Sequence, residues 1–148
     1  MIEVRSAAAD DRAALIRLAS LARADLAGRR GGVDLLATLP TATVRIDGTS
    51  SRFVGLIGGV AVGYACLEID GDRAIITELF VEPPARSVGV GHLLIDALLT
   101  RSGAAGCMTI DASALPGDRA TKNFFEAHAM TARLLIVSRR LDADVDPS

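Results

Sequence analysis

The stretch from Ile75 to Thr100, IITELFVEPPARSVGVGHLLIDALLT, constrains the fold more than any other part of this chain. Its apolar, β-branched opening predicts a strand through Val81, and this strand stops at Pro83-Pro84 because proline has no N–H to donate to a sheet. A loop with Gly89 and Gly91 follows, and leucines at helical spacing then predict a helix. This arrangement favours an anion, since the first-turn N–H groups are free and the helix dipole is positive there.

Four interpretations of the glycine loop compete. A dinucleotide-binding fingerprint requires a third glycine where the chain has Leu94, and a Walker-type phosphate loop requires a Gly-Lys-Ser/Thr ending that is absent. A third interpretation is that the glycines only allow tight packing between strand and helix. The fourth rests on the order Glu-Leu-Phe-Val-x-Pro-x-x-Arg-x-x-Gly-x-Gly before a Leu-rich helix, ungapped from Glu78 to Leu98. This order resembles the acetyl-CoA motif of the GNAT N-acetyltransferases.

The resemblance implies a cofactor site for acetyl-CoA along this segment. A bulge in the strand would splay the sheet, and the strand would pair with the pantetheine arm through the backbones of Leu79, Phe80 and Val81. The diphosphate would meet the loop and the first helical turn, with Arg86 adding charge: Arg86, Ser87, Val88, Gly89, Val90, Gly91 and His92. A second, partial match from Asp118 to Met130 adds Asp118 and Phe125 to the expected cofactor-binding residues.

Acetyl transfer to an amine needs a proton acceptor, because an alkylamine with a pKa near ~10.4 is only ~0.04% neutral at pH 7. Glu78, a carboxylate within an apolar strand, is the candidate general base; the alternative is that it faces solvent or a salt-bridge partner. Phe125 stands where the family often has a tyrosine that protonates the departing thiolate, and a phenyl ring has no proton to give. The other candidate acids are weak, and we assign the role to none of them: Tyr64, His92, Ser113 and His128.

The whole chain predicts an α+β fold with a mixed, mostly antiparallel sheet and helices on both faces. Strands are expected at 2–5, 53–57, 60–69, 73–81, 107–111 and 133–141, and helices at 10–28, 33–39, 89–101 and 118–128. Gly58-Gly59 predicts a two-residue hairpin turn, and 41–51 reads as a surface loop. This order is the one expected of a single-domain GNAT fold over residues 1–141, followed by an acidic tail at 142–148.

Composition narrows the function further. A formal net charge of -2 over 148 residues gives no electrostatic reason to expect a nucleic-acid partner. Cys66 and Cys107 are isolated, so they form neither a metal signature nor a disulfide framework. The chain shows no signal peptide and no apolar run long enough for a membrane span, and a cytoplasmic protein is therefore expected.

These observations predict an acetyl-CoA-dependent N-acetyltransferase acting on a primary amine of a small molecule or a peptide N-terminus. One alternative is a CoA-binding regulatory or vestigial domain with little turnover, which Phe125 keeps open; another is an unrelated α+β binding module. The acceptor should contact the first helices and the loop between Gly28 and Ser51. Arg29 and Arg30 hint at an anionic acceptor, although adjacent loop arginines are usually just solvated. A homodimer through the sheet edge or the last strand is a family expectation.

Overall fold

The computed structural model describes residues 1–29, 32, 50–115, 117–135, 137, 139 and 141. Within them the strands are β1 (Ile2–Ser6), β2 (Ser50–Ile57), β3 (Val60–Asp70), β4 (Arg73–Val81) and β5 (Thr109–Asp111). The α-helices are α1 (Arg12–Ala27), α3 (Val90–Ala104) and α4 (Arg119–Glu126), with short 3-10 helices η1 (Ala9–Asp11) and η2 (Pro83–Ala85). The predicted helix at 33–39, most of the predicted loop at 41–51 and the tail at 142–148 lie outside the described residues.

The strands form one sheet in the order β1-β2-β3-β4-β5. Neighbours are antiparallel from β1 to β4, and β5 runs parallel to β4. Gly58 and Gly59 connect β2 to β3 with φ values of 57° and 82°, which suits the two-residue hairpin turn that the glycine pair predicts. The chain thus builds an antiparallel meander that leads directly into the glycine loop.

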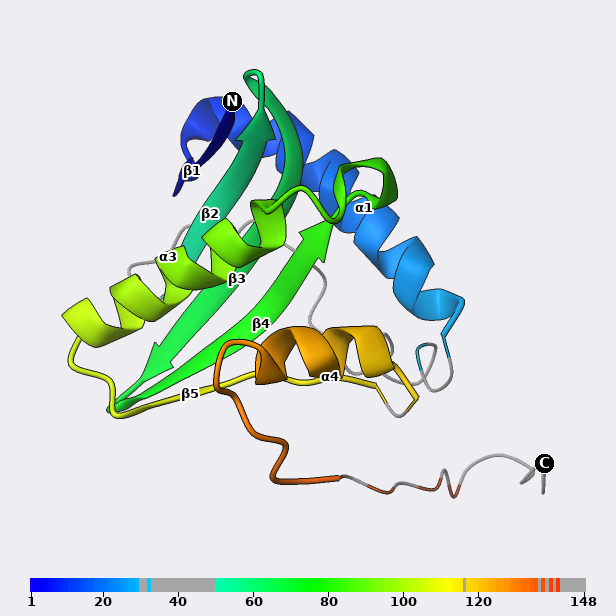
Figure 1. Cartoon of the computed structure of the whole chain (residues 1–148), viewed down its shortest axis with the longest axis vertical. Helices are drawn as coiled ribbons and strands as arrows, with labels where there is room; N and C mark the ends of the chain where they lie inside the picture. The colour runs from blue at the N-terminus through cyan, green and yellow to red at the C-terminus, as the bar shows by residue number, and fades with distance from the viewer. Residues whose placement is uncertain are drawn as a thin grey trace.

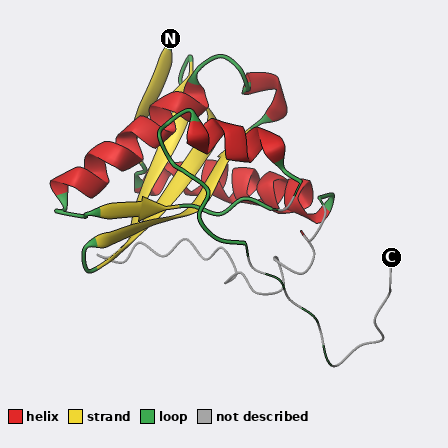
Figure 2. Cartoon of the chain, turned by 60° about the horizontal axis from the view of Figure 1, so that its bottom comes forward, coloured by secondary structure: helices red, strands yellow, loops and turns green. Residues whose placement is uncertain are grey.

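Helices cover both faces of the sheet (Figures 1 and 2). On one face α1 packs Leu15 and Leu18 against a cluster that includes Tyr64 and Phe80. On the other face α3 buries Leu94, Ile95 and Leu98 against Ala65 and Leu67, and Phe125 of α4 joins the same cluster. The predicted α+β class with a mixed sheet between helices is confirmed.

Gly55 on β2 fixes how closely α3 approaches the sheet. A Cβ at this position would lie only 2.6 Å from Cγ1 of Val90, the first residue of α3. Because such a distance is far below van der Waals contact, any larger residue would push the start of the helix away. The glycine in β2 therefore helps to hold the N-terminus of α3 beside the end of β4.

Several predicted boundaries shift in the structure. The helix α3 continues to Ala104, beyond the predicted end at 101, and β5 begins at Thr109 rather than at 107.

The prediction of a strand at 133–141 is wrong for the residues described there, which form no strand. Leu134 and Val137 are 84% and 86% exposed, since a run of apolar residues makes a strand only where a neighbouring strand pairs with it. Among the described residues, the helices are too short or too polar to cross a bilayer.

Candidate functional site

The outer half of β4 has an edge that β5 does not cover. In the described part of the chain, β5 pairs only with Arg73, Ala74 and Ile75. Further along β4, the register with β3 shifts between Glu78 and Ile76, so Thr77 is an extra residue in a β-bulge. Figure 1 shows β4 and β5 meeting at one end and diverging toward the end of β4. The sheet therefore splays beside the segment from Ile76 to Val81.

The backbone groups on this edge can be assigned from the pairing on the other side of β4. The Glu82 N–H donates to the Val62 carbonyl at 2.8 Å, which directs Glu82 toward β3. Because neighbouring residues of a strand direct their backbone groups to opposite sides, Val81 and Leu79 direct theirs to the open edge. Phe80, predicted alongside them, instead pairs with Tyr64 of β3 through its backbone. Two of the three predicted strand residues thus direct their backbone donors and acceptors to the open edge, where the Val81 carbonyl accepts a hydrogen bond from Arg86 Nε at 2.8 Å.

The glycine loop continues directly from this edge into α3. Ser87 and Gly89 have φ values of 70° and 103°, and a left-handed serine is a strained residue of the kind found at functional sites. The first helical hydrogen bond runs from the Leu93 N–H to the Gly89 carbonyl at 3.1 Å. Helix geometry therefore leaves the N–H groups of Val90, Gly91 and His92 without intrahelical acceptors, as an anion site requires.

The N-terminal turn of α3 contacts the end of α4 through three aromatic rings. His92 Nδ1 lies 2.7 Å from His128 Nε2, and both rings lie within 5.3 Å of the Phe124 ring, centroid to centroid. A Cβ on Gly91 would lie 3.3 Å from Phe124, so this glycine also permits the close contact between the helices. Phe125 faces the core and is 8% exposed. Its side chain therefore belongs to the α3 face of the molecule.

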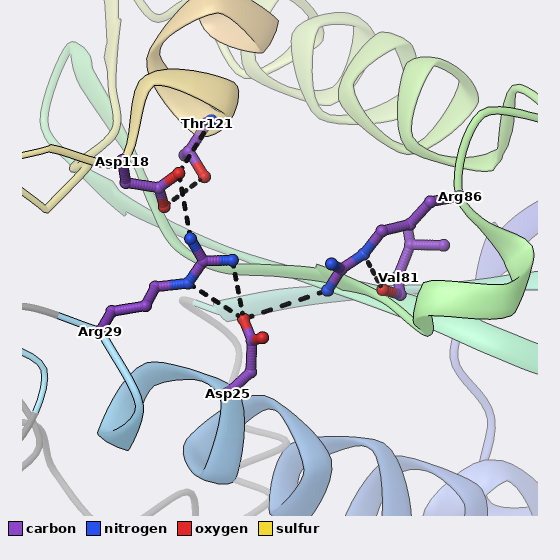
Figure 3. Close-up of polar contacts among 6 residues, drawn as sticks. All are labelled: Asp25, Arg29, Val81, Arg86, Asp118 and Thr121. Atoms are coloured by element: carbon purple, nitrogen blue, oxygen red, sulfur yellow. Dashed lines mark hydrogen bonds and ion pairs between the residues drawn. The ribbon is translucent and has the colours of Figure 1, made fainter.

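Asp118 is engaged inside the protein. Its carboxylate caps α4 by accepting the Thr121 N–H at 3.2 Å and the Thr121 hydroxyl at 2.7 Å. It also forms an ion pair with Arg29 at 3.2 Å (Figure 3), and its side chain is 9% exposed. The residue predicted to bind the cofactor therefore has a structural role that its sequence motif does not reveal.

Glu78, the candidate base, points to the α1 face of the sheet. The Tyr64 hydroxyl donates to Glu78 Oε1 at 3.1 Å, and Tyr64 packs in the cluster formed with α1. Cys66 is the register partner of Glu78 on β3 and is also buried. The carboxylate is therefore held by a neighbouring strand, close to the bulge and to the open edge of β4.

Tyr64 does not take over the acid role that Phe125 cannot perform. Burial, followed by the nearby Glu78 carboxylate, raises the pKa of the Tyr64 hydroxyl well above its ordinary value, which makes it a poorer proton donor. The same two causes raise the pKa of the buried Cys66 thiol and keep it protonated. Both groups act here as neutral neighbours of Glu78, and the hydrogen bond from Tyr64 orients the carboxylate.

Charged residues from separate parts of the chain lie together beside the outer half of β4, and sequence analysis did not predict this group. Asp25 and Arg29 of the α1 end form an ion pair at 3.2 Å, and Arg29 also reaches Asp118. Arg86 extends over the Phe80 ring, with its Cζ 5.6 Å from the ring centroid, toward Asp25 (Figure 3). The four-residue spacing of Asp25 and Arg29 was a usable signal for pairing, whereas their contacts with Arg86 and Asp118 depend on the fold. Arg29 is therefore not simply solvated.

Solved structures share this fold at low sequence identity. A mutant of the BH1408 protein from Bacillus halodurans has a TM-score of 0.76 and 18% identity, covering 94% of this chain and 99% of that chain. An aminoglycoside acetyltransferase from an uncultured soil metagenomic sample, in complex with trehalose, has a TM-score of 0.73 and 18% identity, covering 97% of each chain. The enzyme AAC(6')-Iy, in complex with a CoA-containing bisubstrate analog, has a TM-score of 0.69 and 19% identity, covering 95% and 99%.

Sequence comparison places the chain within a family. A mycothiol acetyltransferase of Stackebrandtia nassauensis is 42% identical over 52 residues, which is 35% of this chain and 17% of that protein's length. The sequence model of the Acetyltransferase (GNAT) family matches residues 17–130, a segment that contains the β4 edge, the glycine loop and the whole charged group beside them. The chain therefore belongs to the GNAT acetyltransferase family.

Proposed function

We propose that this protein is an acetyl-CoA-dependent N-acetyltransferase that acts on a primary amine of a small molecule or a peptide N-terminus. The observation that carries the proposal is the continuity of the open β4 edge with the N-terminus of α3. Leu79 and Val81 offer backbone hydrogen bonds suited to the amides of pantetheine. The loop and first turn, from Ser87 to His92, offer N–H groups and a helix dipole suited to a diphosphate.

The chain's own residues also suit the chemistry. Bound acetyl-CoA supplies an acyl thioester, whose carbonyl carbon is attacked by the amine nitrogen while the carbon–sulfur bond breaks. Glu78 takes the proton that the amine must lose, directly or through one water, and Tyr64 holds the carboxylate in place. Since Phe125 has no exchangeable proton, the departing thiolate takes its proton from solvent. A thiolate is a tolerable leaving group, so this requirement does not prevent turnover.

The chemical class of the acceptor is indicated by the proteins that this chain resembles. Three of the similar proteins named above are called a mycothiol acetyltransferase and aminoglycoside acetyltransferases, which supports a small-molecule amine over a macromolecule. The Glu78 side chain lies on the face of the sheet that α1 covers, toward the charged residues at the end of α1. We expect the acceptor to approach from this face. The homodimer expected from the family stays a prediction.

Calorimetry with acetyl-CoA tests the cofactor site first. We expect submillimolar binding by the wild type and at least about tenfold weaker binding by Gly91→Asp, because the new carboxylate repels the diphosphate at the helix N-terminus. The matched control is Gly103→Asp, which makes the same charge change at the other end of α3, where no atom lies within 4 Å of the added Cβ. It should bind like the wild type.

The result that would overturn the proposal is absence of acetyl-CoA binding by the folded wild type. Once binding is established, thiol release should be followed across a panel of amines. Binding with no thiol release for any amine would favour the alternative of a CoA-binding domain with little turnover. Release with one class of amine would identify the acceptor.

A further inference from the structure

The Arg86 side chain is turned away from the N-terminus of α3 by contacts with the open edge of β4, with the Phe80 ring and with Asp25. Its Nε donates to the Val81 carbonyl at 2.8 Å, and its Nη2 lies 4.0 Å from Asp25 Oδ2 (Figure 3). The Val81 carbonyl belongs to the open edge of β4, where we place the pantetheine arm. The side chain therefore covers a backbone acceptor that a bound pantetheine amide would use.

The contacts of Arg86 connect it to a balanced group of four charges. We call Asp25, Arg29, Arg86 and Asp118 the Asp25 cluster. Arg29 lies 3.2 Å from each of the two carboxylates, so its charge is shared between them, while Arg86 adds the second positive charge beside Asp25. With two cations and two anions, the cluster has no net charge. If Arg86 leaves, one negative charge is no longer balanced.

A nearby diphosphate binds the Arg86 guanidinium more strongly than its present partners do. A guanidinium binds phosphate oxygens with paired, charge-assisted hydrogen bonds, whereas its present contacts are one backbone carbonyl, the face of the Phe80 ring and a carboxylate at 4.0 Å. Its side chain is 41% exposed and starts in the glycine loop, so it can turn without disturbing the core. Asp118 is fixed by Thr121, which leaves Asp25, 34% exposed, as the accessible carboxylate.

We propose that Arg86 couples the two substrates: acetyl-CoA draws it from Val81 and Asp25 to the diphosphate, and Asp25 then binds a positive charge of the acceptor. The inference rests on the proposed function and narrows it. Glu78 accepts the proton of the reacting amine, so Asp25 binds a second cationic group of the acceptor. The favoured acceptors are therefore small molecules with two or more amines. Asp25 is then an acceptor-binding residue that becomes available only with the coenzyme in place.

The coupling can be measured without turnover by a double-mutant cycle on coenzyme affinity. Because Asp25 competes with the diphosphate for Arg86, Asp25→Asn should tighten CoA binding about threefold, and Arg86→Met should weaken it about tenfold. In the Arg86→Met background, Asp25→Asn should change the Kd by less than about twofold. Glu82→Gln is the control for a general effect of lost negative charge, since Glu82 lies near the loop but pairs with Arg17.

Acceptor binding provides the second arm, with 1,4-diaminobutane and 1-aminobutane as probes. In the wild type, saturating CoA should tighten binding of the diamine about tenfold and leave the monoamine nearly unaffected. Asp25→Asn should lose this gain for the diamine. A diamine that binds equally well with and without CoA would overturn the inference.

The outcomes separate this inference from the proposed function. If the folded wild type does not bind CoA, both fail. If the wild type binds CoA but Asp25→Asn has the same effect with and without Arg86, or the same effect as Glu82→Gln, only the coupling fails. A non-additive cycle together with a CoA-dependent diamine site supports it.

Discussion

The two flanks of the outer half of β4 are built in different ways. The flank that we assign to the coenzyme comes from one continuous segment, from Leu79 through the glycine loop to His92. The α1 flank is assembled from distant parts of the chain: Asp25 and Arg29 from the α1 end, Tyr64 from β3, Glu78 from β4 and Asp118 from the start of α4. The comparison teaches that the coenzyme contacts depend on local backbone geometry, whereas the acceptor side depends on side chains that the tertiary structure brings together.

The largest effect should come from the α1 flank. Glu78→Gln removes the proton acceptor but keeps a similar shape, so kcat should fall by about 100-fold or more while acetyl-CoA affinity stays the same. Steady-state thiol release and calorimetry on the same preparation give the two quantities. If both are unchanged, a water or another group accepts the proton and the assignment of Glu78 fails. If acetyl-CoA affinity falls together with kcat, Glu78 contributes to coenzyme binding as well, and the two flanks do not have separate functions.

The coenzyme flank should be sensitive to packing under α3. Gly55→Ala places a Cβ against Val90, so we expect a loss of about 1–3 kcal/mol in the free energy of unfolding, together with weaker acetyl-CoA binding. Urea denaturation measures the first and calorimetry the second. The second-site change Val90→Ala should restore part of both losses.

Gly103→Ala is the matched control for this prediction. It adds the same methyl group within α3, where nothing lies within 4 Å of the new Cβ. Helix propensity predicts a gain of up to about 1 kcal/mol and unchanged binding. Equal effects of the two substitutions would show that α3 is not positioned through Gly55.

The same contrast explains how far sequence analysis could reach. The strand, the glycine loop and α3 were predictable because proline, glycine and leucine spacing act locally, and only the ends of the elements moved. Three other features could not be predicted, because each depends on which strand or helix lies alongside. They are the backbone pairing of Phe80 with β3, the hydrogen bond from Tyr64 to Glu78 and the role of Asp118. The segment at 133–141 opens with an apolar run typical of a strand, but such a run gives no information about the partner that a strand must pair with.

Asp118 tests whether a motif match identifies a ligand or a cap. Asp118→Ala removes the cap of α4 and the ion pair with Arg29, so the free energy of unfolding should fall by about 1–2 kcal/mol. The structure predicts that acetyl-CoA affinity changes by less than about threefold. A large loss of affinity with unchanged stability would instead support the cofactor-binding role that the sequence motif suggests.

The smallest effect concerns Tyr64 and is best detected through pH. Near neutral pH, Tyr64→Phe removes the hydrogen bond to Glu78 and should cost about 1 kcal/mol in the free energy of unfolding. Folding raises the pKa of Tyr64 above its ordinary value of 10.0, so the folded state holds this proton more tightly than the unfolded state. The stabilisation linked to this proton is complete below pH 10.0 and is lost as the pH rises above it.

The wild type should therefore lose about 1.4 kcal/mol per pH unit more than Tyr64→Phe above that point, and the difference between them should close and then reverse. Cys66 has its pKa raised as well, but it contributes equally to both proteins and cancels in the comparison. Urea unfolding curves at neutral and alkaline pH would measure the difference. Parallel pH profiles would show that Tyr64 is not withdrawn from water, and the α1 flank would then be as open as the β4 edge on the other side.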